Sequence, residues 1–149
     1  WLECQAQDLA KESREEIAER SLAVLADPAF ADVFGPNAMA EVPLAATVEG
    51  LVVVGTADRL LVEAERVTVV DFKTARRPPS VAEEIPLSTR RQLGAYASAL
   101  KVIYPDREIR AAVLYTQSAE LMEIPSDILA ENNPRLSPGQ QSYPRVAVE

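Results

Sequence analysis

The chain has 149 residues, 48% of them hydrophobic, which suffices for one packed domain and argues against disorder over most of its length. Its formal charge of −8 argues against an isolated nucleic-acid binder, because such proteins are usually basic. With no histidine and one cysteine, the chain excludes Ser-His-Asp and Cys-His catalysis and any cysteine-based zinc or iron–sulfur site of its own. No apolar run reaches the ~20 residues that a membrane-spanning helix needs.

The predicted elements begin with a helix over residues 5–26, where charged residues surround an apolar stripe. Asp27-Pro28 ends this helix, because a residue before proline disfavours helical geometry. Extended segments are predicted over residues 41–48 and 51–55, and a two-stranded hairpin over residues 58–73, where valines mark the second strand. The first half of the chain therefore changes from helix to sheet.

The second half repeats that change. A helix is predicted after Pro86, with Ser88 as its cap, and runs to about Ile103. The remaining predicted elements are strands over residues 108–116 and 119–124 and a short helix over 126–130. This order predicts an α/β (α+β) domain in which helices pack on a central mixed sheet.

We expect residues 1–130 to form a single domain. Residues 131–149 are rich in Pro, Asn, Gln and Ser, and we expect them to form a flexible tail. The sequence starts at Trp1, without an initiator methionine and inside a helical pattern. We therefore expect the chain to be a piece of a longer protein.

The most informative segment is the predicted hairpin, whose turn centres on Ala64 and Glu65. That centre places Asp58 directly opposite Asp71, where like charges are destabilising because facing Cβ atoms are only ~4.5–5.5 Å apart. Lys73 shares the face of Asp71, because residues two apart in a strand point the same way. Two facing carboxylates beside a lysine predict a site for a divalent metal ion and a phosphate. The alternative is a hairpin whose acids point into solvent.

Magnesium is the metal that this pattern favours, because it prefers a few carboxylate oxygens and keeps several waters. Asp58 and Asp71 are the predicted ligands, and the backbone carbonyl of Phe72 is a further candidate. A metal there would activate water and offset the charge that builds on a phosphate. Lys73 is the candidate for orienting that water or stabilising the phosphate.

Other candidate residues flank the hairpin. Gln92 and Tyr96 lie four apart and share one face of the second predicted helix, although such a tyrosine is usually part of a core. Glu41 precedes a strand and is either a remote metal or supporting group or an exposed charge at a strand edge. Two basic pairs are candidate phosphate contacts or solvated charges: Arg76 with Arg77, and Arg90 with Arg91.

Three segments taken together resemble the motifs of the PD-(D/E)XK nuclease superfamily, and more narrowly of its RecB-type branch. They are Gly55-Thr56-Ala57-Asp58-Arg59, Val69-Val70-Asp71-Phe72-Lys73-Thr74 and Gln92-Leu93-Gly94-Ala95-Tyr96, which have the order and spacing of that branch. The segments 40–44 and 103–105 resemble the C-terminal nuclease domain of AddA, the helicase–nuclease subunit of bacterial AddAB complexes. The resemblance spans residues 15–130 approximately.

The resemblance implies a restriction-endonuclease-like core in the order α-β-β-β-α-β. It implies that Asp58 and Asp71 bind the metal, that Lys73 is the catalytic lysine, and that Gln92 and Tyr96 line the site. The implied activity is exonucleolytic cleavage of DNA with Mg²⁺, for which Mn²⁺ can substitute, in double-strand break repair and recombination. The implied partners are single strands of DNA delivered by a helicase motor, and an AddB-type subunit, with no membrane. ATP belongs to the helicase part outside this chain, and the implied location is the cytoplasm.

One feature departs from the family pattern, in which an early helix supplies a histidine to the metal site. This chain has no histidine, and its first residues resemble the segment that follows that helix, so we expect the fragment alone to bind metal weakly and to cleave DNA poorly or not at all. One rival interpretation is an inactive nuclease-like scaffold or DNA-end-binding domain, and another is an acidic protein-interaction module. Asp58 and Asp71 carboxylates on opposite faces of the sheet would contradict every interpretation that includes a metal.

Overall fold

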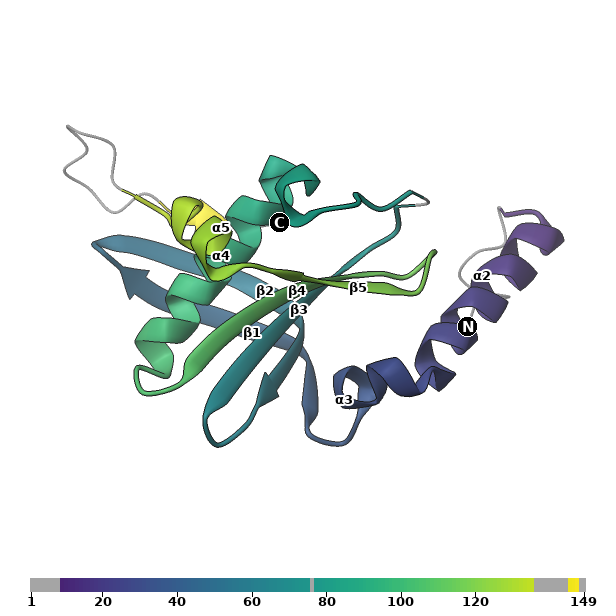
Figure 1. Ribbon diagram of the computed structural model, residues 1–149, viewed down its shortest axis with the longest axis horizontal. Helices are drawn as coiled ribbons and strands as arrows, with labels where there is room; N and C mark the ends of the chain where they lie inside the picture. The colour runs from purple at the N-terminus through teal and green to yellow at the C-terminus, as the bar shows by residue number, and fades with distance from the viewer. Residues whose placement is uncertain (1–8, 76, 136–144, 148–149) are drawn as a thin grey trace.

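The computed structural model describes residues 9–75, 77–135 and 145–147. Helices lie on both faces of one mixed sheet, as predicted, and the chain order contains the expected α-β-β-β-α-β core (Figure 1). The elements are α2 (Lys11–Ala26), η1 (Pro28–Phe30), α3 (Ala31–Phe34), β1 (Ala38–Val48), β2 (Leu51–Val62), β3 (Arg66–Lys73), η2 (Ala82–Glu84), α4 (Leu87–Ile103), β4 (Glu108–Tyr115), β5 (Glu120–Ile124), α5 (Ser126–Glu131) and β6 (Arg145–Ala147).

The strands of the described residues lie in the order β1-β2-β3-β4-β5, and β6 pairs with β2. The β1–β2, β2–β3 and β4–β5 pairs are antiparallel, whereas β3–β4 and β2–β6 are parallel. Parallel neighbours need a long crossover connection, and α4 supplies it between β3 and β4. Both sequence motifs on β2 and β3 therefore lie in the middle of the sheet.

The two faces of the sheet are covered unequally. One core cluster joins α4 and α5 to the sheet through residues such as Leu93, Leu100 and Ile128. On the other face, Val24, Phe30 and Val33 from α2, η1 and α3 pack on Val70, Ala112 and Leu114. Most of α2 projects away from the sheet, as Figure 1 shows. The α4 face is consequently the better-packed support for a rigid site.

Several predicted boundaries change in the structure. The predicted helix over residues 5–26 becomes α2, which begins at Lys11, and residues 1–8 lie outside the described part of the chain. The separate strands predicted before and after Gly55 form one strand, β2. The predicted cap of α4 is wrong: the helix begins at Leu87, Pro86 is its N-cap residue, and Ser88 lies inside the first turn.

The predicted flexible tail falls partly outside the described residues, which omit 136–144 and 148–149. Within it, Arg145–Ala147 forms β6, a strand that the sequence did not predict. β6 pairs with residues 52–54 of β2, whereas β3 pairs with residues 59–62 of the same strand. β1 occupies the other edge of β2 throughout, so β6 and β3 share one edge. A gap over residues 55–58 separates them.

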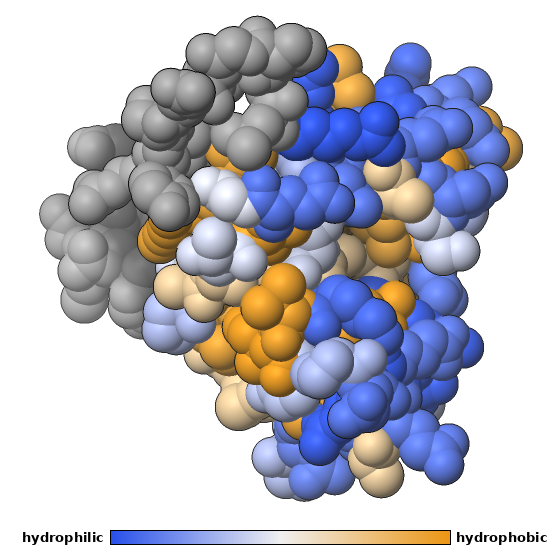
Figure 2. All heavy atoms as spheres, turned by 90° about the vertical axis from the view of Figure 1, so that its left-hand side faces the viewer, coloured by the Kyte–Doolittle hydropathy of each residue, from blue (hydrophilic) through white to orange (hydrophobic). Residues whose placement is uncertain are grey.

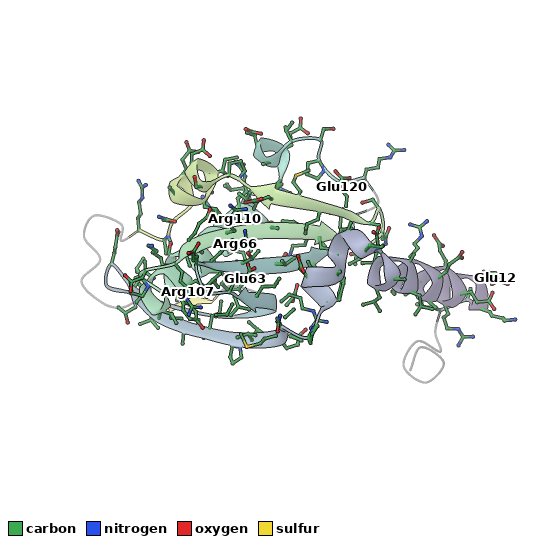
Figure 3. All side chains as sticks on the ribbon, turned by 60° about the horizontal axis from the view of Figure 1, so that its bottom comes forward. Glu12, Glu63, Arg66, Arg107, Arg110 and Glu120 are labelled. Atoms are coloured by element: carbon green, nitrogen blue, oxygen red, sulfur yellow. The ribbon has the colours of Figure 1, made fainter. Side chains whose placement is uncertain are left out.

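Charges and apolar side chains on the surface are mixed. Figure 3 shows Glu63, Arg66 and Arg110 close together over the sheet, and Arg66 Nη2 lies 2.7 Å from Glu63 Oε2. Figure 2 shows the end of the molecule opposite α2, where apolar residues lie in several small patches among hydrophilic residues. Among the described residues, none of the helices has the length and apolar character needed to cross a membrane.

Candidate active site

The site lies where β2 and β3 separate. The register predicted from a turn at Ala64 and Glu65 is confirmed, because β2 and β3 pair from Val62–Val67 to Arg59–Val70. Beyond Arg59 the described residues of β2 have no further partner in β3. β3 itself continues to Lys73, paired with β4 over its whole length. The last residues of β3 therefore have a neighbour on one edge only.

The Asp58 carboxylate takes the place of the next strand hydrogen bond. Along an antiparallel ladder, every second pair of facing residues is hydrogen-bonded. Glu63 N donates to Arg66 O at 2.8 Å, so counting from that pair, the next hydrogen-bonded pair beyond Arg59–Val70 would be Ala57 with Phe72. In the structure, Phe72 N donates to Asp58 Oδ2 at 2.6 Å instead. A hydrogen bond between a carboxylate and a backbone N–H is strong, and this one fixes Asp58 against β3.

The face of β2 that points to the core changes at the same place. Ala57 and Leu60 belong to the same core cluster although they are three residues apart, whereas a regular strand puts such residues on opposite faces. The β1 register places Glu41 opposite Asp58, and Glu41 has a φ of 51°, a left-handed conformation that is rare for glutamate in a strand. The irregularity lies at Asp58, beside the point where the β2–β3 ladder ends.

Asp71 and Lys73 form the other half of the site, on the face of β3 that Val67 and Val69 turn towards α4. Asp71 is 5% exposed and its Oδ2 lies 2.8 Å from the ammonium of Lys73. The angle of approach does not make a hydrogen bond, so this buried oxygen has an ion pair but no aligned donor. Burial raises the pKa of Asp71, Lys73 lowers it, and the charge of Asp58 raises it further. The charge of Asp58 thus acts on the Asp71 carboxyl near the end of the β2–β3 ladder.

The raised pKa of Asp71 predicts a pH-dependent effect on stability. Because folding favours the protonated carboxyl, its contribution is complete below the unfolded pKa near 3.8 and is lost as pH rises through the higher folded pKa. We expect Asp71→Asn to raise the unfolding temperature of the metal-free protein at pH 7, with the difference shrinking towards pH 4. Calorimetry in EDTA measures it, and a less stable Asp71→Asn protein at pH 7 contradicts it.

Gln92 and Tyr96 approach the site from α4 in different ways. Gln92 is buried, and its Oε1 accepts from Lys73 Nζ at 3.4 Å. Tyr96 is buried as well, but its hydroxyl donates to the carbonyl of Thr56 at 2.9 Å. Gln92 thus contacts the charged pair, whereas Tyr96 holds β2 two residues before Asp58.

Gly55 is required by the ring of Tyr96. A Cβ atom at residue 55 would lie 2.5 Å from Cε1 and 2.6 Å from Oη of Tyr96, closer than real Cβ atoms approach other atoms. We expect Gly55→Ala to destabilise the fold by about 1–3 kcal/mol, as overpacked cores do, measured as a lower urea midpoint. In a Tyr96→Ala background the same change should cause no further loss, and an equal loss in both backgrounds contradicts the clash.

Phe72 has a backbone carbonyl directed into the gap between β2 and β3. Thr116 N donates to Lys73 O, so residue 73 faces β4, and strand alternation directs the N–H and C=O of Phe72 towards β2. Two carboxylates and this carbonyl form an oxygen donor set of the kind that Mg²⁺ and Mn²⁺ prefer. Oδ2 of Asp71 has no aligned hydrogen-bond donor, so it is available to such a cation.

The described residues contain no cluster of three acidic or thiol side chains around one position, so Glu41, which is exposed, does not join the two aspartates.

The predicted arginines are less closely tied to the site. Arg77 and Arg91 are exposed, Arg90 is half-buried, and Arg76 lies outside the described residues. Arg59, which follows Asp58, has a structural place that the sequence did not predict. Its guanidinium lies 5.5 Å from the ring centre of Phe34 and 6.0 Å from that of Phe72, which supports β3 from the face opposite the carboxylates. An arginine between the apolar residues Ala57 and Leu60 of β2, directly after Asp58, was the available signal.

The fold and these side chains define a restriction-endonuclease-like nuclease core. The model of the PD-(D/E)XK nuclease superfamily matches residues 1–142, and the chain belongs to that superfamily. Among curated proteins there is no match. Seven chains of solved structures match; one, the crystal structure of SSO0001, is 18% identical with a TM-score of 0.41. That match covers 85% of this chain and 61% of the other.

Proposed function

We propose that this chain is the metal-dependent DNA exonuclease domain of a RecB-type helicase–nuclease that acts in double-strand break repair and recombination. The observation that carries the proposal is the position of Asp58, Asp71 and Lys73. Lys73 pairs with Asp71, and Asp58 accepts from the backbone N–H of Phe72 between them, where the β2–β3 ladder ends. Packing does not explain this arrangement, because the charge of Asp58 and burial both disfavour ionised Asp71.

Asp58, Asp71 and the carbonyl of Phe72 are the groups that would hold a divalent cation, Mg²⁺ or Mn²⁺. Members of this superfamily usually use divalent metals, and the donor set here is composed of oxygens. When bound, such a cation supplies Lewis-acid stabilisation of the charge that builds on a phosphodiester. Asp58 is already fixed by the N–H of Phe72, so one of its two oxygens stays available for this role.

Lys73 connects the buried carboxylates to the surface. Its side chain is 35% exposed, whereas that of Asp71 is 6% exposed, so the ammonium can reach a substrate phosphate or its attacking water. Gln92 restrains the same ammonium from α4. A restrained cation aimed at a developing negative charge stabilises a transition state better than a mobile one, because little reorganisation is needed.

The substrate in this proposal is single-stranded DNA that a helicase motor delivers in the cytoplasm. The acidic charge of −8 fits a domain that relies on motor domains to hold the DNA backbone. Arg77 and Arg91 are exposed and are the described candidates for local phosphate contacts. The proposed partners are the ATP-dependent helicase portion and an AddB-type subunit, supported by the RecB-type spacing of the three motifs.

A nuclease-like scaffold or DNA-end-binding domain is the rival function. It is favoured by the lack of a third acidic ligand among the described residues. An acidic protein-interaction module is less consistent with the site, because Asp71 is buried beside Lys73 and away from solvent.

Lys73→Ala separates the nuclease from its rivals. In the full-length protein we expect it to reduce cleavage of a labelled single strand by about 10²-fold, the loss typical of one transition-state contact. Mn²⁺ affinity should stay the same or increase, because Asp71 loses its competing ion pair. Lys11→Ala on exposed α2 is the control and should cleave normally. Normal cleavage by the Lys73→Ala protein contradicts the proposal.

A further inference from the structure

β4 ends in a buried hydroxyl group that the fold does not use. Tyr115, the last residue of β4, is 2% exposed, and its phenol oxygen is buried without a hydrogen-bond partner among the described residues. A buried hydroxyl without a partner is destabilising. Phenylalanine would fill nearly the same volume without that penalty. The hydroxyl therefore needs a role outside the packing of the core.

Tyr115 lies beside the catalytic residues on their face of the sheet. The parallel β3–β4 register pairs Lys73 with Tyr115, and Asp71 lies two residues earlier in β3. Opposite residues, and residues two apart, share a face, so all three side chains point towards α4. Burial, then the charge of Glu120, then that of Asp71 raise the pKa of Tyr115, so the phenol keeps its proton at neutral pH.

Asp71 has a buried acceptor oxygen that lacks an aligned hydrogen-bond donor. Its Oδ2 is buried and has the ammonium of Lys73 at 2.8 Å but no aligned hydrogen-bond donor. A donor without an acceptor and an acceptor without an aligned donor thus lie on neighbouring strands, facing the same side. Direct contact or one bridging water would satisfy both, and buried waters commonly join such groups.

Glu120 is the competing acceptor, because it lies directly opposite Tyr115 in the β4–β5 pair. Figure 3 shows Glu120 at the start of β5, away from the group of Glu63, Arg66 and Arg110. Glu120 is exposed, so water already satisfies its carboxylate. Asp71 is buried, so a donor inside the protein matters more to it than to Glu120.

We propose that Tyr115 is a positioning residue for Asp71, whose carboxylate accepts a hydrogen bond from the Tyr115 hydroxyl, directly or through one bound water. This contact holds the carboxylate in the orientation that a divalent cation needs. The cation part rests on the proposed function, whereas the hydrogen bond does not. Groups that orient a metal-binding carboxylate typically change metal affinity about 10–100-fold when removed.

A double-mutant cycle in EDTA tests the hydrogen bond. Tyr115→Phe should lower the urea midpoint of the wild-type chain but not that of Asp71→Ala, because the partner is then absent. Glu120→Gln provides the rival background, in which the effect of Tyr115→Phe should persist. Equal effects of Tyr115→Phe with and without Asp71 overturn the proposal, and so does an effect that disappears only with Glu120.

Calorimetric titration with Mn²⁺ tests the role in cation binding. Tyr115→Phe should weaken Mn²⁺ binding by about 10-fold. Tyr104→Phe, at the far end of α4, should leave the affinity unchanged. Unchanged affinity in Tyr115→Phe overturns the positioning role alone. A wild-type chain that takes up no Mn²⁺ at saturating concentration overturns the proposed function, and the cation role of Tyr115 with it.

Discussion

Replacing Asp71 by alanine is expected to abolish DNA cleavage by the full-length protein while ATP-driven unwinding continues. Asp71 is the buried carboxylate that pairs with Lys73, so its loss removes both a proposed metal ligand and the ion-pair partner of the proposed catalytic lysine. A metal supplies several kcal/mol of transition-state stabilisation and each ~1.4 kcal/mol is tenfold, so cleavage should fall by about 10³-fold or more.

The measurement follows unwinding and strand cleavage on the same labelled DNA substrate. Asp106→Ala is the matched control, because Asp106 is an exposed aspartate before β4, at the opposite end of that strand from Lys73 and Tyr115. It should unwind and cleave as the wild type does. Loss of both activities in Asp71→Ala, or of neither, contradicts the division of roles between this domain and the motor.

Asp58 should show two separable functions. Its carboxylate accepts the N–H of Phe72 at 2.6 Å, which is a structural role, and its charge acts on Asp71, where we propose a metal-binding role. Asp58→Asn keeps an oxygen acceptor for Phe72 but removes the charge. Asp58→Ala removes both and leaves the Phe72 N–H without its partner, which costs about 1–3 kcal/mol where water cannot replace it.

We therefore expect both Asp58 variants to lose cleavage by about 10³-fold, on the same reasoning as for Asp71. Only Asp58→Ala should be clearly less stable, with a lower urea midpoint in EDTA. If Asp58→Asn cleaves like the wild type, the charge has no catalytic role. If both variants are equally destabilised, the hydrogen bond to Phe72 is not what holds Asp58 in place.

Much of the site follows from local sequence patterns. The turn between the two valine-rich strands sets their register, which the structure confirms up to Arg59–Val70. Strand alternation then places Lys73 beside Asp71. These relations depend on residues close in sequence or on one ladder, so a pattern of side-chain types is enough to predict them.

The remaining features of the site and the fold depend on where the β2–β3 ladder ends and on which element packs beside β2 beyond that point. The sequence does not show that Asp58 replaces a strand hydrogen bond, because that depends on β3 separating from β2. It does not show that the Tyr96 hydroxyl bonds the carbonyl of Thr56, since helix spacing says nothing of the strand beneath. β6 was missed for a similar reason: its three residues acquire strand geometry only by pairing with β2.

The central claim is that Asp58 and Asp71 together hold one divalent cation where β2 and β3 separate. A crystal of the chain soaked in Mn²⁺ and measured at the manganese absorption edge tests this claim most directly. We expect one anomalous peak in direct contact with a carboxylate oxygen of each aspartate, and no such peak in an Asp71→Asn crystal. Manganese bound elsewhere at saturation, with these two carboxylates free of it, would contradict the account.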